Sequence, residues 1–249
     1  MISLRTFSLA ALVLTLLLAW PLEVSAAETP DAARRQEIET IVREYLRAHP
    51  EIVMEALQEM ERRGQEAQQK QRVETIRARL AELTQDPASP VGGNPKGSVT
   101  IVEFFDYQCG YCKREAAEMT KLLQADPDVR VVYKDLPILG PASVFAARAA
   151  LAAQKQGKHA ALHAALLETS ERLTEQEVLR LAAQVGLNVA QLEKDMADPS
   201  VTAALDRNFQ LQRALNIQGT PALIVGTEFV PGAANLDTLN ALVARARKR

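Results

Sequence analysis

The sequence predicts an α/β domain in which helices cover a sheet, preceded by a separate helical segment. Strand-like runs at 99–105 and 129–133 come before a long helical stretch at 142–215, and a hairpin pattern at 222–230 follows it. Strands on both sides of a helical stretch are typical of a sheet with helices packed on its faces. From Asp31 to Leu83 the chain is rich in Glu, Arg, Gln and Ala and has no strand pattern, which predicts helices there.

Bulk composition limits the class of protein. At 249 residues, the chain can hold one sizeable domain with additions or two small ones, and a hydrophobic content of 47% is ample for a buried core. The formal net charge is −2, so the charge balance suggests no nucleic-acid partner.

Residues 1–26 are typical of a secretory signal peptide. Arg5 gives a weakly positive start, the run from Leu9 to Leu18 is almost entirely apolar, and Val24-Ser25-Ala26 presents small residues where a signal peptidase would cut. The apolar run is short for a membrane span, which needs about 20 residues; a retained anchor is the alternative. We therefore expect a mature protein that begins near Ala27 and works outside the cytoplasm, in the periplasm.

Residues 27–88 form the expected helical stalk. A first apolar stripe has the three-four spacing of a coiled-coil seam, through Ile38, Ile41, Tyr45, Ala48 and Ile52. Pro50 suits the first turn of a new helix, and a second stripe follows at Val53, Leu57 and Met60. Helices with so little apolar surface need a partner. Either they pack on the main domain, or they join copies of the chain into a dimer or trimer, which the narrow stripes favour.

Residues 89–249 form the expected main domain. Its boundary lies in the Pro- and Gly-rich runs 86–90 and 92–95, just after an apolar edge through Val73, Ile76, Leu80 and Leu83. Lys113 to Gln124 has helical character, and the helical insertion is expected at about 141–215. Leu236, Leu239, Leu242 and Val243 then line a final helix.

The two cysteines of the chain occur together, as Cys109-Gly110-Tyr111-Cys112, directly after the first strand. In an oxidising compartment such a pair is a structural disulfide or a reactive dithiol. In the chain-entropy model, closing so short a ring stabilises a fold by about 2 kcal/mol, against roughly 3 for a fifteen-residue loop. Because the ring constrains so little, we interpret the pair as a redox-active dithiol; an inert pair and a metal site are the alternatives.

A helix that begins at this motif would make Cys109 the nucleophile. The unpaired N–H groups and the dipole at a helix start favour a thiolate there, and we expect this sulfur to be open to solvent. Cys112, one turn deeper, would resolve the mixed disulfide by attacking Cys109. Gly110 and Tyr111 offer backbone N–H groups but no cation, so we expect a moderate activation.

Glu103 is the unusual residue in the apolar strand Ile101–Phe105. A carboxylate inside an apolar strand is costly unless it is paired or protonated. If its side chain lies beneath the dithiol, it can accept and return the proton of Cys112, which is our interpretation. Strand alternation could instead turn it to solvent as an ordinary edge charge.

Two distant motifs carry a resemblance to a known family. The run Phe104–Lys113 (FFDYQCGYCK) and the downstream Gly219–Ala222 (GTPA) resemble the thioredoxin superfamily, and more narrowly its secreted DsbA-like branch, in which helices are inserted into the thioredoxin fold. Tyr45–Ile52 (YLRAHPEI) and Leu136–Gly140 (LPILG) make the chain most similar to the copper-sensitivity-suppressor proteins called ScsC. The resemblance implies a thioredoxin fold with an inserted helical subdomain, behind an N-terminal oligomerisation segment.

The resemblance also implies catalytic residues. Cys109 and Cys112 match the redox pair of the family, and Glu103, six residues before Cys109, matches its buried acid. Pro221 matches the cis-proline that faces the dithiol, with Thr220 before it. Cis bonds are rare even before proline, so this expectation can be checked.

Substrate contacts follow from the same resemblance. Exposed backbone at Thr220 would pair with an extended client segment as an added strand, and Gly110 and Tyr111 would flank the client. Gly-Tyr between the cysteines departs from the Pro-His of strong DsbA-type oxidants and agrees with isomerases of the DsbC type. We therefore expect a potential between about −120 mV for DsbA and −270 mV for thioredoxin.

These features favour an oligomeric disulfide isomerase or reductase, because several active sites on one assembly raise their local concentration around a client. A DsbA-like oxidase is the alternative. The resemblance implies cysteine-containing client proteins, no cofactor, and a membrane redox partner of the DsbD or ScsB type, or of the DsbB type for an oxidase.

Copper binding is a further alternative, since two thiolates could hold Cu(I). His159 and His163 lie one helical turn apart, as metal ligands can, but their alanine-rich neighbours favour packing or helix-surface residues. We therefore predict no metal ligands in the chain.

Overall fold

The computed structural model describes residues 31–248. The expected signal peptide, residues 1–26, and the expected mature start at Ala27 lie outside the described residues. The chain divides into two compact units, with the division between Arg63 and Gly64.

The N-terminal unit is helical, as the sequence predicts. α1 spans Ala32–Ala48 and α2 spans Pro50–Ala78, so Pro50 takes the first position of α2, where a missing N–H is tolerated. Gly64 lies inside α2 and does not end it. No residue of α1 is buried, and large apolar side chains of α1 and α2 stay exposed: Ile38, Ile41, Val42, Tyr45, Ile52, Val53, Met54, Leu57 and Met60.

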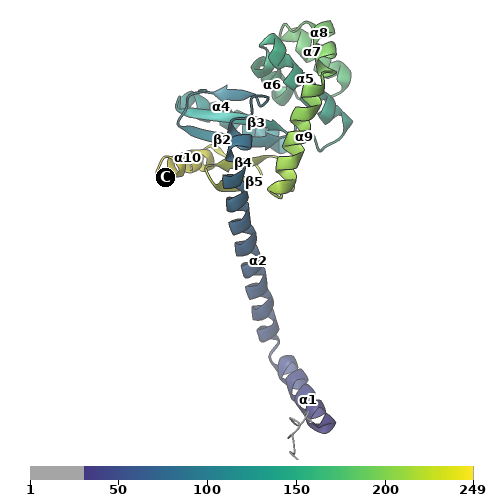
Figure 1. Ribbon diagram of the computed structural model, residues 1–249, viewed down its shortest axis with the longest axis vertical. Helices are drawn as coiled ribbons and strands as arrows, with labels where there is room; N and C mark the ends of the chain where they lie inside the picture. Colours follow the sequence, from purple (N-terminus) through teal and green to yellow (C-terminus); the bar gives the residue numbers. More distant parts are fainter. Residues whose placement is uncertain (1–30, 249) are drawn as a thin grey trace, which may run out of the picture. The chain divides into compact units, whose positions relative to one another are not determined.

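A five-stranded mixed sheet forms the centre of the second unit (Figure 1). Its order is β1 (Val91–Gly93), β3 (Val129–Asp135), β2 (Val99–Phe105), β4 (Ala222–Val225) and β5 (Glu228–Pro231). β2 and β3 are parallel, and the other neighbours are antiparallel. β2 lies in the middle and is buried along nearly its whole length, which explains why all its residues except Thr100 and Glu103 are apolar.

β1 is a strand that the sequence did not predict. Its residues Gly92 and Gly93 fall in the run that we interpreted as a boundary, and a strand of three residues with two glycines carries no apolar alternation. A side chain at Gly92 would come within 2.6 Å of the Tyr133 hydroxyl, so the glycine leaves room for that ring. The backbone pairing with β3, and not a side-chain pattern, therefore makes these residues a strand.

Helices cover both faces of the sheet, as predicted. α4 (Gly110–Ala125) and α10 (Leu236–Ala246) pack on one face, where Ile101 and Val131 meet Met119, Leu122 and Leu239. α9 (Pro199–Ala214), α3 (Leu80–Thr84) and the end of α2 contribute to the other face, in a cluster that contains Ile76, Leu83, Val102, Phe104 and Leu211. The last part of the expected stalk thus packs on the main domain, the first of the two interpretations given for these helices.

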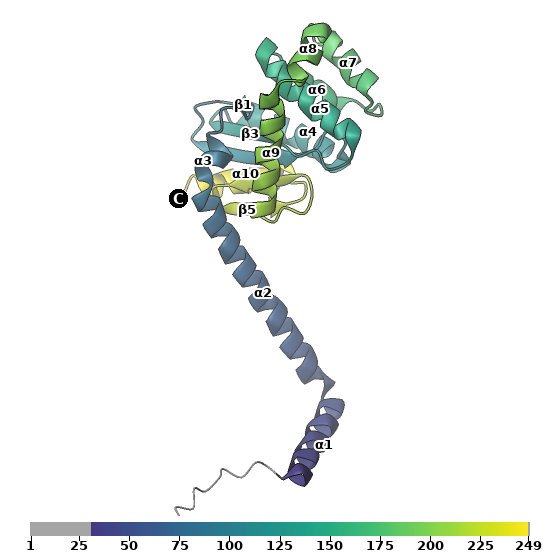
Figure 2. The same ribbon diagram turned by 45° about the vertical axis from the view of Figure 1, so that its right-hand side comes forward.

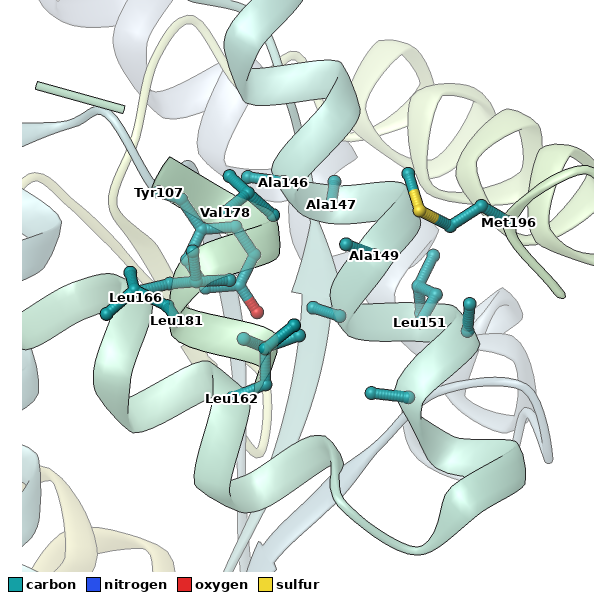
Figure 3. Packing of buried hydrophobic residues seen from close by; sticks show 14 of the residues in the cluster. Tyr107, Ala146, Ala147, Ala149, Leu151, Leu162, Leu166, Val178, Leu181 and Met196 are labelled. Atoms are coloured by element: carbon teal, nitrogen blue, oxygen red, sulfur yellow. The ribbon is translucent and has the colours of Figure 1, made fainter. Parts of the chain in front are cut away.

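The helical insertion packs around a core that it shares with Phe105, Tyr107 and both cysteines, and α5–α8 lie together to one side of the sheet in both views (Figures 1 and 2). It consists of α5 (Pro141–Ala153), a 3-10 turn at Gln154–Gln156, α6 (His159–Glu168), α7 (Glu175–Gln184) and α8 (Val189–Met196), and α9 leads back to the sheet. Figure 3 shows Ala146, Ala147 and Ala149 of α5 near Leu162 of α6 and Val178 of α7. Small side chains on α5 let the neighbouring helices approach closely.

The start of α7 has the cap that its sequence favours. Thr174 and Glu177 have the spacing of a capping box, and the Thr174 hydroxyl caps α7 by accepting a hydrogen bond from the Glu177 N–H at 3.1 Å. Among residues 31–248, no helix combines the length and the apolar character needed to cross a membrane.

Candidate active site

Cys109 lies at the start of α4, as predicted. It is the N-cap of the helix, and its Sγ accepts a hydrogen bond from the backbone N–H of Cys112 at 3.4 Å. Both cysteines are free thiols in this structure. The helix start therefore directs an unpaired backbone donor at the first sulfur, which stabilises negative charge there.

The expectation that the Cys109 sulfur is open to solvent is wrong for this structure. Cys109 is only 6% exposed. Its thiol donates a hydrogen bond to the carbonyl oxygen of Thr220 at 3.2 Å, so the Thr220 backbone lies against the sulfur. The neighbouring Gly110 and Tyr111 are exposed, Tyr111 to 62%. The Cys109 sulfur is thus covered by the Thr220 backbone, and the exposed residues beside it are Gly110 and Tyr111.

The Thr220–Pro221 peptide bond is cis, as the resemblance implies. Thr220 is 111 positions from Cys109 in sequence, yet its carbonyl contacts the cysteine sulfur. The Pro221 carbonyl in turn accepts a hydrogen bond from the N–H of Gly232 at 2.9 Å, just after β5. Because Ala222 begins β4 beside the central β2, the sheet itself places this loop next to the dithiol.

Cys112 is buried beneath Cys109. It has no exposed surface, and this burial raises the pKa of its thiol well above the ordinary value; the adjacent Cys109 raises it further. Cys112 is therefore a protonated thiol at neutral pH. It can act as a nucleophile only when a nearby group takes its proton.

Glu103 is also buried, with 2% exposure. In β2 its side chain shares a face with Ile101, which packs against α4, the helix that carries the cysteines. Desolvation raises the pKa of this carboxyl well above its usual range, and the nearby Glu115 adds to the shift. The alternative of a solvated edge charge does not apply, because both faces of β2 are covered.

A cavity of about 800 Å³ lies beside Glu103. Its walls come from α4, α6, β1 and β3, and Glu103, Lys113, Tyr133 and His163 are among its polar lining residues. Apolar side chains such as Met119, Leu123 and Leu167 make up much of the rest. Glu103 is thus one of the polar residues that border this cavity, and neither cysteine lines it.

Glu115 is a site residue that the sequence analysis missed. It lies on α4 three residues after Cys112 and is 1% exposed. Its Oε2 accepts a hydrogen bond from the N–H of Ala234 at 2.6 Å, while Oε1 has no hydrogen-bond partner. Burial raises the pKa of this carboxyl to about 7. The sequence could have indicated this burial, because Glu115 lies at helical spacing on the same face of α4 as Cys112, Met119 and Leu122, the other buried residues of the helix.

Asp106 is a second missed residue, and it organises the entry to the motif. Its carboxylate accepts hydrogen bonds from the N–H groups of Gln108, Ile138 and Leu139 and from the Ser143 hydroxyl, at 2.7–3.0 Å. The hydrogen bonds of Asp106 thus link the loop before α5 to the segment that leads into Cys109. The sequence offered one indication of this role, because Asp106 is an acidic residue at the end of a buried strand and shortly before the dithiol.

His159 and His163 are packing residues, in agreement with the sequence interpretation. Both are at least nine-tenths buried, and His163 Nδ1 is 3.0 Å from the Tyr107 hydroxyl. Burial lowers the pKa of His159 to about 4 and that of His163 to about 3, so both rings are neutral at physiological pH. Within residues 31–248 no cluster of three or more His, Cys, Asp or Glu side chains could hold a metal ion.

The geometry of the dithiol, the cis-proline and the inserted helices agrees with comparisons to known proteins. A model of the DsbA-like thioredoxin domain matches residues 100–244. This chain belongs to the DsbA-like thioredoxin domain family. A model of the copper resistance protein ScsC N-terminal domain matches residues 35–68, the region of α1 and the first part of α2.

Solved structures show the same relationship for this DsbA-like chain. A thioredoxin-like oxidoreductase from Silicibacter pomeroyi DSS-3 is 50% identical, with a TM-score of 0.67, over 68% of this chain and 98% of that one. A Proteus mirabilis ScsC variant is 28% identical, with a TM-score of 0.68, over 90% and 99%. A periplasmic thioredoxin-like protein from Salmonella enterica serovar Typhimurium is 36% identical, with a TM-score of 0.63, over 68% and 95%.

Curated relatives of the DsbA-like domain include longer proteins. The Na(+)/H(+) antiporter NhaA 3 of Salinispora tropica is 29% identical over 63% of this chain, and the chain spans 24% of that protein. The likeness therefore concerns one part of the antiporter. The fold of this chain, with two cysteines close together at a helix start, is that of the DsbA-like thiol–disulfide oxidoreductases.

Proposed function

We propose that this protein is an oligomeric disulfide isomerase or reductase of the periplasm that acts through Cys109 and Cys112. One observation carries the proposal: the Cys109 sulfur caps α4 and lies against the carbonyl that precedes the cis-Pro221 bond. This contact places the nucleophile beside a stretch of backbone that can pair with an extended client. Thr220, Gly110 and Tyr111 are the proposed client contacts.

In the first step, the Cys109 thiolate attacks one sulfur of a client disulfide. The client S–S bond breaks, a mixed disulfide forms, and the second client sulfur leaves as a thiolate. In isomerisation, a client thiolate then attacks another client disulfide or the mixed disulfide and finally expels Cys109. The client ends with rearranged disulfides, and the enzyme ends with both of its thiols.

In reduction, Cys112 attacks the Cys109 sulfur of the mixed disulfide and releases the client as a thiol. Cys112 must first lose its proton, and we propose Glu103 as the acceptor. Because burial raises the pKa of both groups, proton transfer from Cys112 to Glu103 is less unfavourable than transfer to an ordinary carboxylate. The enzyme ends with a Cys109–Cys112 disulfide, and a membrane donor of the DsbD or ScsB type returns two electrons.

The N-terminal helices support the oligomer. Their apolar side chains Ile38, Ile41, Tyr45 and Met60 are 52–69% exposed, and the family model for the ScsC N-terminal domain covers them. We propose that a second or third copy of this chain covers the stripes, as a dimer or trimer. Several dithiols on one assembly then act on the same misfolded client.

The in vivo redox state of the dithiol tests the direction of electron flow. Thiol trapping in the native host should find Cys109 and Cys112 mostly reduced. The purified mature protein should restore activity to scrambled ribonuclease. A mostly oxidised pair, with fast oxidation of reduced ribonuclease and no rescue of the scrambled form, would instead show the DsbA-like oxidase served by a DsbB-type partner.

A further inference from the structure

The active-site helix holds the cis-proline loop at two points. At its start, the Cys109 thiol donates a hydrogen bond to the Thr220 carbonyl at 3.2 Å. Six residues later, the Glu115 carboxylate accepts one from the Ala234 N–H at 2.6 Å. Between these points the Gly232 N–H bonds to the Pro221 carbonyl at 2.9 Å. These three bonds close a ring that runs from α4 through the Thr220–Pro221 backbone and the segment after β5, and back to α4.

Oxidation opens this ring at one point. The bond to Thr220 needs the proton of the Cys109 thiol. When Cys109 enters a disulfide, with Cys112 or with a client, that proton has left and the sulfur can no longer donate. The Glu115 bond does not involve sulfur, so it survives every redox state of the dithiol.

We propose that Glu115 is a positioning residue, which keeps the Thr220–Pro221 backbone in place for a client strand while Cys109 is in a disulfide. The inference rests on the proposed thiol–disulfide exchange and deepens it. Glu115 does not touch the client or the reacting sulfurs. It acts through Ala234, Gly232 and Pro221.

Fold stability alone does not account for a carboxyl at this position. Glu115 is buried on a helix face whose other buried members are Cys112, Met119 and Leu122, and its Oε1 has no partner. An apolar side chain of similar size would fill this space without the cost of burying a carboxyl. The feature that an apolar residue cannot supply is an acceptor for the Ala234 N–H.

Two substitutions of Glu115 separate the hydrogen bond from other effects. Glu115→Gln keeps an acceptor oxygen, whereas Glu115→Leu removes it and fills the space. Lys121→Ala, on the exposed side of α4, is the matched control. Each protein is assayed with a peptide that contains a disulfide, under dithiothreitol turnover, and with 5,5′-dithiobis(2-nitrobenzoate), which has no peptide backbone to pair with Thr220.

We expect Glu115→Leu to raise the KM for the peptide about tenfold, as expected when one hydrogen bond is lost, and to leave its kcat within about twofold. The rate with the small disulfide should stay within about twofold of wild type. Glu115→Gln and Lys121→Ala should match wild type for both substrates. An equal fall with both substrates, an unchanged peptide KM in Glu115→Leu, or a Gln variant as impaired as the Leu variant would overturn the proposal.

Hydrogen exchange of the wild-type protein gives a test that needs no substitution. The Ala234 amide should stay protected when the dithiol is oxidised, because Glu115 still accepts its hydrogen bond. Loss of that protection on oxidation would overturn the inference. Failure of wild type to react with either disulfide would overturn the proposed function instead, so the two failures are distinguishable.

Discussion

Burial decides what each residue of the dithiol site can do. Cys112 and Glu103 have almost no exposed surface, and desolvation raises the pKa of both. Because both pKa values are raised, transfer of the Cys112 proton to the ionised form of Glu103 would cost less than transfer to an ordinary carboxylate. Cys109 differs because it caps the helix and its sulfur receives the Cys112 N–H. The two cysteines thus have different surroundings because Cys112 lies one helical turn further along α4.

Replacing Cys112 by serine should trap clients. Cys109 can still attack, but no second thiol releases the mixed disulfide, so adducts accumulate. Non-reducing electrophoresis followed by mass spectrometry should find client adducts on Cys112→Ser and none on Cys109→Ser. Adducts formed through Cys112 in the Cys109→Ser variant would show that the assignment of the nucleophile is reversed.

Glu103→Gln should change the pH dependence of stability. Folding raises the pKa of Glu103, so the wild-type protein loses stability as pH rises from the unfolded carboxyl pKa, about 4.3, towards the raised folded value. The glutamine variant lacks this loss. Its advantage in free energy of unfolding over wild type, measured with denaturant on the reduced proteins, should therefore be larger at pH 8 than at pH 4. The same difference at both pH values would contradict a buried, raised carboxyl.

The same variant should be slow in the resolving step. Without a carboxylate to take the Cys112 proton, release of a preformed mixed disulfide should slow about 100-fold, in the range typical of general acid–base catalysis. Stopped-flow release of a fluorescent peptide from Cys109 measures this step. Attack by Cys109 on a small disulfide is the internal control and should change little.

At the scale of elements, the alternation of β2 distributes its side chains between two cores. Ile101 joins the core under α4 and α10, while Val102 and Phe104 join the core under α9, α3 and the end of α2. Glu103 therefore lies on the face of the sheet that α4 covers. The opposite core depends on residues from before the Pro- and Gly-rich boundary, so α3 is part of the domain that carries the site.

Two leucines of α3 provide a matched test of how this helix packs on the sheet. Leu83 is fully buried in the sheet core, whereas Leu80 is 47% exposed. Leu83→Ala should lower the free energy of unfolding by about 2–5 kcal/mol, as expected for a buried leucine. Leu80→Ala should cost less than about 1 kcal/mol. Denaturant titration of the mature protein measures both, and equal losses would show that α3 is not anchored through Leu83.

At the scale of the whole molecule, the two units have different amounts of buried apolar surface. The unit from Gly64 onwards contains the sheet, the helical insertion and the dithiol. The described helical residues before it bury almost nothing within the chain and leave Ile41 and Tyr45 more than half exposed. Helices with such a face are stable when another surface covers it.

Charge placed in the first apolar stripe should dissociate the proposed oligomer. Light scattering on the mature protein should give the mass of a dimer or trimer, and the double variant Ile38→Glu, Ile41→Glu should give that of a monomer. Thr40→Glu, between the two positions but off the stripe, is the control. The monomer should keep its rate with small disulfides and lose most of its isomerase activity. A wild-type monomer, or unchanged isomerase activity in the double variant, would argue against the assembly.

Several features followed from the sequence because local patterns are sufficient for them. Pro50 marks the start of α2, Thr174 the start of α7, and the apolar run at 99–105 a buried strand. β1 could not be predicted, because two glycines have no side-chain pattern and only pairing with β3 makes them a strand. Asp106 was missed for a related reason: its hydrogen-bond partners at Ile138, Leu139 and Ser143 are more than thirty positions away.

The sequence by itself determined where the dithiol lies, since the two cysteines come one helical turn apart directly after a buried strand. The depth of the two sulfurs and the face on which Glu103 lies were decided by the tertiary structure. So was the joining of Thr220, Pro221 and Ala234 to α4. These contacts link residues about 110–120 positions apart. Only the packing of β4, β5 and α10 around the central strand brings them together.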